Sequence, residues 1–200
     1  MQHDASNNLT DLRKGRIVFL VGPSGSGKDS LIDAAEPLLT RRGMRRARRV
    51  ITRSAESRGE QATGVLPEVF ERMKEEGAFA LHWRANGLAY GIPSEMDDWL
   101  AAGHSVLVNG SRAHLPQALQ RYRDMLVICL TVEPATLRQR LLARGRETAV
   151  EIEQRLARNG RFEPGAVSAV HEIDNSGNLH ATVQKLIRLL EEQGVLTGQA

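Results

Sequence analysis

Short apolar runs alternate with amphipathic stretches along most of the chain. The clearest runs are rich in β-branched residues and bounded by polar residues or glycine: Arg16–Val21, Ser105–Asn109, Leu126–Val132 and Ser168–Asp174. Runs of this kind predict strands that are buried on both faces. A sheet of such strands is mainly parallel, because the crossover helices that join parallel strands cover both of its faces.

Helical periodicity fills the segments between these runs. The predicted helices cover about Lys28–Leu39, Pro67 to a stop at Gly77, a segment from about Pro93, Pro116–Arg123, Ala135–Ala143, Ala149–Ala157 and Leu179–Leu190. The alternation of strands and helices predicts an α/β fold, in which ligands bind at the carboxyl ends of the strands.

Shorter strands are predicted between the first helix and residue 93. Arg48–Thr52 is expected to be one strand, and the following Arg53–Gly64, rich in Ser, Gly and charge, to be a loop. Ala78–Arg84 and Leu88–Ile92 flank Asn86-Gly87, a pair that favours a tight hairpin turn.

Length and composition predict one domain. A chain of 200 residues holds one sizeable core, which we expect over 15–192, between a flexible N-terminal tail (1–14) and a C-terminal tail (193–200). With 41% hydrophobic and 26% charged residues, the composition is that of a soluble globular protein. No apolar run approaches the roughly 20 residues that span a bilayer, and residues 1–8 lack the apolar core of a secretory signal. We therefore expect a cytoplasmic protein without a membrane partner.

Charge and cysteine content argue against nucleic-acid binding, disulfide bonds and a cysteine metal site. The net charge is +3, and six arginines lie within Arg41–Arg49. Such a cluster can bind a polyanion, or it can be a solvated helix end and strand entry. Because no aromatic residue stands among these arginines, the stacking surface of single-strand binders is missing, and we expect no nucleic acid. The single Cys129 lies in an apolar run and predicts neither a disulfide nor a cysteine metal site.

One motif carries the chemistry. The stretch Gly22-Pro-Ser-Gly-Ser-Gly-Lys28-Asp29-Ser30 follows the first strand and precedes the first helix, as the phosphate-loop pattern G-x-x-x-x-G-K-[ST] requires. Backbone N–H groups of such a loop point at a bound phosphate, and the helix dipole favours the negative charge. Lys28 is spaced to reach the β- and γ-phosphates of a nucleotide. We expect the whole loop to bind the nucleotide: Gly22, Pro23, Ser24, Gly25, Ser26, Gly27, Lys28, Asp29 and Ser30.

Asp29 departs from this pattern, since most such loops place a Ser or Thr hydroxyl on Mg²⁺ at this position. A carboxylate is a harder and stronger magnesium ligand than a hydroxyl, so Asp29 can bind the ion directly or through water. An acidic residue in a first helical turn is also favoured by the helix dipole without any metal. The sequence leaves both interpretations open.

Several segments resemble the guanylate kinase family in their order and spacing. They are the loop Gly22–Ser30, Ile51-Thr52-Arg53, Asn86–Gly91, the strand and turn ending in Asn109-Gly110, and Arg144–Thr148 with Arg155-Leu156. The resemblance covers about residues 16–190. Within the family, the chain is most similar to the ribose 1,5-bisphosphate phosphokinases of phosphonate catabolism, which it matches in the loop including Asp29 and in residues 106–117 and 137–141.

The resemblance implies a P-loop kinase with a mainly parallel sheet, an acceptor-binding insertion at about 45–93 and an arginine-rich lid at about 138–161. It implies ATP as co-substrate, Mg²⁺, and a reaction that converts ribose 1,5-bisphosphate to 5-phosphoribosyl 1-diphosphate with release of ADP. The expected catalytic residues are Lys28, Arg144 and Arg155, and Arg146, Arg53 and Tyr90 are expected to bind the acceptor. Asn109 and Arg112 are expected to face the cleft from a strand end, although Asn109 could merely cap a turn. We expect a monomer or a homodimer.

Two departures from ordinary guanylate kinases concern the acceptor. Those enzymes resemble one another in a Phe-Leu-Glu run whose Glu reads the guanine edge, and here the run is Phe79-Ala-Leu81. The tyrosine expected after the Thr-Arg loop is also missing from Gly64–Phe70. An apolar side chain cannot accept the N–H donors of guanine, so we expect an acceptor without a base. A nucleoside monophosphate kinase is the alternative enzyme, and a non-catalytic guanylate-kinase-like binding module, disfavoured by the complete loop with Lys28, is the third class.

Overall fold

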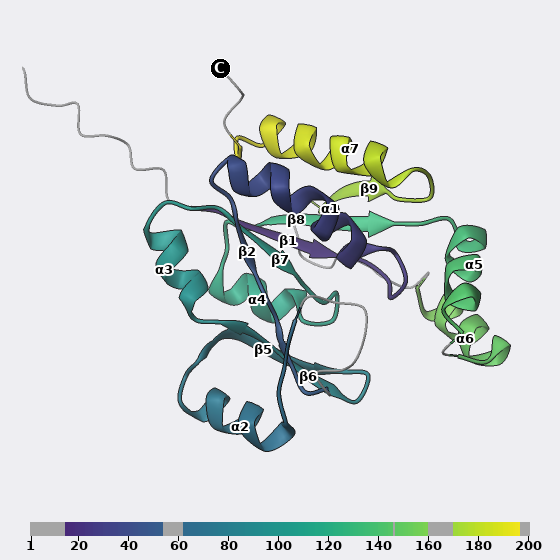
Figure 1. Cartoon of the computed structure of the whole chain (residues 1–200), viewed down its shortest axis with the longest axis horizontal. Coiled ribbons are helices and arrows are strands. Elements are labelled where there is room, and N and C mark those ends of the chain that lie inside the picture. The colour runs from purple at the N-terminus through teal and green to yellow at the C-terminus, as the bar shows by residue number, and fades with distance from the viewer. Residues whose placement is uncertain (1–14, 54–61, 146, 160–169, 197–200) are drawn as a thin grey trace, which may run out of the picture.

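The computed structural model describes residues 15–53, 62–145, 147–159 and 170–196. Its core is a five-stranded parallel sheet in the order β2-β7-β1-β8-β9 (Figure 1). The strands are β1 (Ile17–Val21), β2 (Arg45–Ala47), β7 (Val106–Asn109), β8 (Leu126–Thr131) and β9 (Val170–Asp174). The expected parallel sheet is confirmed.

Helices cover both faces of this sheet, because its strands are apolar on both sides. In β1, Val18 and Leu20 pack with α1 (Lys28–Arg41) and α7 (Leu179–Glu192), which lie together on one face (Figure 1). Phe19 points to the opposite face, towards α3 (Glu95–Ala101) and α4 (Leu115–Arg121). Successive side chains of a strand alternate in this way, so a fully apolar strand needs a cover on each side.

A smaller sheet, in the order β4-β3-β6-β5, carries α2 (Pro67–Glu75) and lies beside the main sheet (Figure 1). Its strands are β3 (Val50–Ile51), β4 (Thr63–Gly64), β5 (Phe79–Ala85) and β6 (Leu88–Pro93). The hairpin between β5 and β6 is confirmed. Asn86 and Gly87 have φ values of 52° and 75°, and positive φ at both central residues is what the favoured two-residue hairpin turn requires.

The strand predicted over Arg48–Thr52 is present but covers only Val50–Ile51 (β3), and β2, just before it, was not predicted. Ala47 in β2 pairs with Val108 of the main sheet, whereas Val50 in β3 pairs with Gly91 of the small sheet. The chain therefore leaves one sheet and enters the other within residues 48–49. β4 also lies inside the segment that the sequence predicted to be a loop, where it pairs with β3 over two residues.

Two helices at the carboxyl end of the main sheet form a separate projection, α5 (Pro134–Arg144) and α6 (Ala149–Asn159) (Figure 1). They pack on one another through Leu137, Leu141 and Ile152.

Near the C-terminal end of the described chain, residues 193–196 pack onto the core, and Leu196 is buried. The sequence had placed these residues in a tail. The predicted N-terminal tail (1–14) lies outside the described residues. None of the helices described is both long and apolar enough to cross a membrane.

Candidate functional site

The loop between β1 and α1 has the predicted setting, joining a parallel strand to a helix start at the carboxyl end of the sheet. Two of its glycines are required by the backbone. Gly27 has a φ of 89°, and a Cβ there would stand 2.7 Å from Asn175 Nδ2. Gly22 has a φ of 156°, and a Cβ there would stand 2.6 Å from the carbonyl oxygen of Leu130. Residues 22–27 can therefore close tightly over the strand end only with glycine at these positions.

Lys28 lies folded back over this loop. Its Nζ donates hydrogen bonds to the carbonyl oxygens of Gly22 at 2.9 Å and Pro23 at 3.2 Å. Loss of water around the ammonium group lowers the pKa of Lys28 to about 8, and the positive charges of Arg49 and Arg112 act in the same direction. Bringing an anion to the loop would reverse this effect, because an opposite charge favours the ammonium form.

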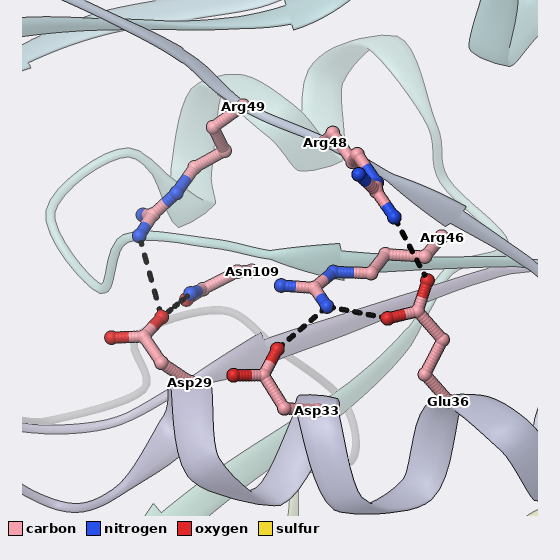
Figure 2. Close-up of polar contacts among 7 residues, drawn as sticks. All are labelled: Asp29, Asp33, Glu36, Arg46, Arg48, Arg49 and Asn109. Carbon is pink, nitrogen blue, oxygen red and sulfur yellow. Dashed lines mark hydrogen bonds and ion pairs between the residues drawn. The ribbon is translucent and has the colours of Figure 1, made fainter. Parts of the chain in front are cut away.

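Asp29 occupies the first turn of α1 and points towards the end of β7 (Figure 2). Its Oδ1 accepts a hydrogen bond from Asn109 Nδ2 at 2.6 Å and lies 3.8 Å from a guanidinium nitrogen of Arg49. The position agrees with a favourable interaction with the helix dipole. The carboxylate also connects the phosphate loop to two elements that are distant in the sequence.

Asn109 and Arg112 stand at the carboxyl end of β7, as predicted. Asn109 is 5% exposed, and within the described structure its Oδ1 has no hydrogen-bond partner. A buried amide oxygen without a donor is rare in a folded protein and is expected to find one in a ligand or water. Arg112 follows in the next turn, where partial burial lowers its pKa, and its charge acts on Lys28. Both residues therefore face the phosphate loop.

Arg53 and Tyr90 are brought together by the small sheet. Ile51 of β3 pairs with Tyr90 of β6, and Thr52 exchanges hydrogen bonds with the backbone of Ala89 at 2.8 and 3.0 Å. Arg53 follows Thr52 directly, so its backbone lies close to the part of β6 that contains Tyr90.

The Tyr90 ring takes part in a stack of rings. It lies parallel to Trp83 with a centroid separation of 5.4 Å, and Trp83 in turn stacks on His114 at 5.2 Å. The guanidinium of Arg49 lies over the Tyr90 ring, 5.2 Å from its centroid. These contacts with Trp83 and Arg49 therefore fix the orientation of the Tyr90 ring.

The predicted lid residues lie on α5 and α6. Arg155 donates to Ser24 Oγ in the phosphate loop at 3.2 Å and forms an ion pair with Glu147. Arg144 is exposed in the last turn of α5. It lines an open cavity of about 410 Å³ together with residues of the phosphate loop, α1, α5 and the segment from β9 into α7: Gly25, Gly27, Ser30, Arg140, Ala143, Asn175, Gly177 and Leu179. Arg146 lies outside the described residues.

Comparisons with known proteins identify the family. No family model matches the chain. The protein named ribose 1,5-bisphosphate phosphokinase PhnN in Pseudomonas fluorescens (strain SBW25) is 60% identical over 181 residues, which cover 88% of this chain and 95% of that protein. Proteins of the same name from Azotobacter vinelandii and Enterobacter lignolyticus are 56% and 45% identical. Each of these two alignments covers 90% of this chain, and they cover 97% and 94% of the length of the two relatives, respectively. The chain belongs to the ribose 1,5-bisphosphate phosphokinase PhnN family.

A solved structure supports the same fold for this PhnN family member. Guanylate kinase from Anaplasma phagocytophilum superposes with a TM-score of 0.63, covering 92% of this chain and 89% of that one, at 19% sequence identity. At this identity the likeness concerns the fold alone. The predicted guanylate-kinase-like α/β fold is confirmed.

The chain has an apolar residue, Leu81, at the position where guanylate kinases resemble one another in a carboxylate that reads the base. Leu81 is 5% exposed and belongs to a core cluster with Trp83, Ile92 and Met96. The leucine side chain has no hydrogen-bond acceptor. A carboxylate buried at this position without a polar partner would destabilise the fold.

One residue that supports the phosphate loop, Asn175, was missed by the sequence analysis. Asn175 lies directly after β9. Its Nδ2 donates to the main-chain carbonyl oxygen of Ser26 at 2.8 Å, and its main-chain carbonyl oxygen accepts a hydrogen bond from Arg140 at 2.8 Å. Its Oδ1 accepts from Thr182 at 2.8 Å. These bonds brace the phosphate loop against α5 and α7. A polar pair, Asp174-Asn175, at the carboxyl end of a buried strand is the signal that could have indicated it.

Proposed function

We propose that the protein transfers the γ-phosphate of ATP to the anomeric phosphate of ribose 1,5-bisphosphate, forming 5-phosphoribosyl 1-diphosphate and ADP. The observation that carries the proposal is the 60% identity to a protein named for this substrate, across 95% of that protein's length. The geometry supports the proposal, since a phosphate loop with Lys28 faces a group of arginines, and the apolar Leu81 cannot form a hydrogen bond with a base.

The proposed mechanism needs alignment and charge neutralisation and no general base. An oxygen of the anomeric phosphate, already ionised at neutral pH, attacks the γ-phosphorus of ATP, and the bond from that phosphorus to the bridging oxygen of ADP breaks. Loop amides and Lys28 hold the donor phosphates, and Arg53 and Tyr90 hold the acceptor phosphate. Arg155, already hydrogen-bonded to the loop at Ser24, and Arg144 neutralise charge on the transferring group.

Asn109 and Arg112 complete the proposed acceptor side. The buried Oδ1 of Asn109 can accept a hydrogen bond from a sugar hydroxyl, which would supply its missing donor. Arg112 adds positive charge close to Lys28. In this proposal residues 45–93 form the acceptor-binding region and the α5–α6 helices belong to the lid, to which Arg146 is also assigned.

Mg²⁺ fits beside Asp29. Among the residues that the structure describes, no group of three or more His, Cys, Asp or Glu side chains is arranged to hold a metal ion. Magnesium bound with a nucleotide typically takes only one or two carboxylates, the other ligands being phosphates and water. Asp29 supplies one carboxylate at the loop, and the ion, when bound, would neutralise charge on the phosphates of ATP.

Asp29→Ala is predicted to raise the magnesium concentration for half-maximal rate on the order of 10-fold, because it removes the carboxylate that would hold the ion. Magnesium titrations at saturating ATP and acceptor measure this. Asp33→Ala is a matched control, since Asp33 lies on the same helix and pairs with Arg46 instead. An unchanged titration with a stability loss of about 1 kcal/mol or less would favour the helix-dipole role.

ATP binding is predicted to take up a proton above pH 8. The free Lys28 has a pKa of about 8, and bound phosphates raise it again by favouring the ammonium form. At about pH 9 most free Lys28 is neutral, so uptake approaches one proton, and at about pH 7 Lys28 contributes little. Calorimetry in buffers of different ionisation enthalpy measures the uptake. It should disappear in Lys28→Ala, and its absence from the wild type at the higher pH would contradict the proposed role.

Release of ADP across a panel of acceptors tests the proposed function. We expect turnover with ribose 1,5-bisphosphate and little with GMP, AMP or ribose 5-phosphate. Turnover with GMP alone would make the protein a nucleoside monophosphate kinase. No turnover with any acceptor, with nucleotide still bound, would indicate a binding module.

We also propose that the enzyme works in the cytoplasm, where ATP is available, as a monomer or homodimer. Light scattering coupled to size-exclusion chromatography measures the assembly, and a larger species would contradict this part of the proposal.

A further inference from the structure

The arginine cluster at residues 41–49 divides into residues with different surroundings. Arg46 in β2 is 8% exposed and forms ion pairs of 2.7 Å with both Asp33 and Glu36 of α1 (Figure 2). Arg48 is 59% exposed and lies 3.6 Å from Glu36. Since buried charges in folded proteins are paired, the contacts of Arg46 account for it as an anchor between β2 and α1.

Arg49 differs from both. Its side chain is 11% exposed and extends towards Asp29 at the start of α1, not towards the acids further along the helix (Figure 2). One guanidinium nitrogen lies 3.8 Å from Asp29 Oδ1, while the centre of the guanidinium lies 5.2 Å from the centroid of the Tyr90 ring. Arg49 therefore contacts the phosphate loop's helix and the small sheet at once.

Positively charged side chains gather at this position. Arg49 and Arg112 both act on the charge of Lys28, and the carboxylate of Asp29 acts on it in the opposite direction. An anion bound between Lys28 and Tyr90 would interact favourably with these cations.

We propose that Arg49 binds the reacting phosphate of the acceptor, with Asp29 and the Tyr90 ring holding its guanidinium in place. This inference rests on the proposed function and adds a residue to it. A guanidinium can bind a phosphate through two parallel N–H···O bonds, which fixes orientation as well as charge. Stacking on an aromatic ring orients the planar group. The reacting phosphate would then be held by Tyr90 in β6, by Arg53 just after β3 and by Arg49 just before β3.

Arg49→Gln tests the proposal. We expect kcat/KM for the acceptor to fall on the order of 10- to 100-fold, which corresponds to loss of a charge-assisted hydrogen bond, while KM for ATP stays within about twofold. Arg49→Lys, which keeps the charge and loses the planar fork, should recover only part of the loss. Arg48→Gln is the matched control from the same cluster and should behave like the wild type.

A second readout separates binding from folding. Calorimetric titration of the acceptor into enzyme loaded with a non-hydrolysable ATP analogue should show weaker binding in Arg49→Gln at an unchanged melting temperature. If that variant unfolds, the same titration on Arg49→Lys decides. Acceptor affinity and turnover equal to those of Arg48→Gln would overturn the proposal, as would an equal loss of ATP affinity.

Failure of this inference is distinguishable from failure of the proposed function. Every acceptor in the panel carries a phosphate, so the effect of Arg49→Gln is measured on whichever acceptor the wild type uses best. A preference for GMP with an intact Arg49 effect would refute only the substrate assignment. Use of ribose 1,5-bisphosphate without an Arg49 effect would refute only the inference.

Discussion

Lys28→Ala is expected to lower turnover by about 10²–10³-fold or more, because it removes the positively charged side chain that the phosphate loop provides for the transferring group. The loop backbone should still form. The positive φ values of Gly22 and Gly27 and the hydrogen bond from Asn175 to Ser26 remain when the hydrogen bonds from Lys28 Nζ to Gly22 and Pro23 are lost.

The same change is not expected to destabilise the fold. The pKa of Lys28 is lowered to about 8, so the folded protein disfavours the charged lysine at neutral pH relative to the unfolded chain. Turnover and thermal melting by circular dichroism measure the two effects separately. The exposed Lys185→Ala is the control and should retain wild-type turnover. Near-normal turnover in Lys28→Ala, with its fold intact, would remove Lys28 from the mechanism.

The second large effect is discrimination between acceptors. We expect kcat/KM for ribose 1,5-bisphosphate to exceed that for GMP by several powers of ten, on the scale of about 10⁴ seen when designed hydrogen bonds are missing. Leu81 is buried among apolar side chains, so the donors of a guanine edge would lose water and find no acceptor there. Ribose 5-phosphate should also fail, since it lacks the anomeric phosphate that attacks.

Leu81→Glu sharpens this prediction. The new carboxylate should not improve use of ribose 1,5-bisphosphate, and like-charge repulsion should weaken it. Steady-state kinetics with both acceptors, on wild type and variant, measure the effect, and a melting curve detects any cost of burying the carboxylate. A wild-type preference for GMP would contradict the assignment of the acceptor.

Local patterns predicted most of the fold. The strands β1, β7 and β8 and the β5–β6 hairpin lie where apolar runs and the Asn86-Gly87 pair placed them, because burial on both faces and turn geometry depend on adjacent residues. The change of sheet at residues 48–49 could not be found in this way. Whether Ala47 pairs with Val108 and Val50 with Gly91 is decided by tertiary contacts.

The site shows the same division. The phosphate loop is continuous in sequence and was predicted as a whole, whereas the side chains that surround it come from separate elements. Asn109 reaches Asp29 across 80 residues, and Asn175 reaches Ser26 across 149. The position of Arg49 follows from the same change of sheet. Residues 48–49 connect the main sheet to the small sheet, and Arg49 there contacts both Asp29 of α1 and Tyr90 of β6. A run of arginines carries no local signal that separates an anchor from a phosphate ligand.

Phosphorus NMR of the products tests the central claim most directly. The protein is incubated with ATP, Mg²⁺ and equal concentrations of ribose 1,5-bisphosphate and GMP. We predict a new pair of coupled diphosphate signals from 5-phosphoribosyl 1-diphosphate, an unchanged 5-phosphate monoester signal, and ADP in equal amount. Formation of GDP in place of the sugar diphosphate, or ADP accompanied only by inorganic phosphate, would contradict the account.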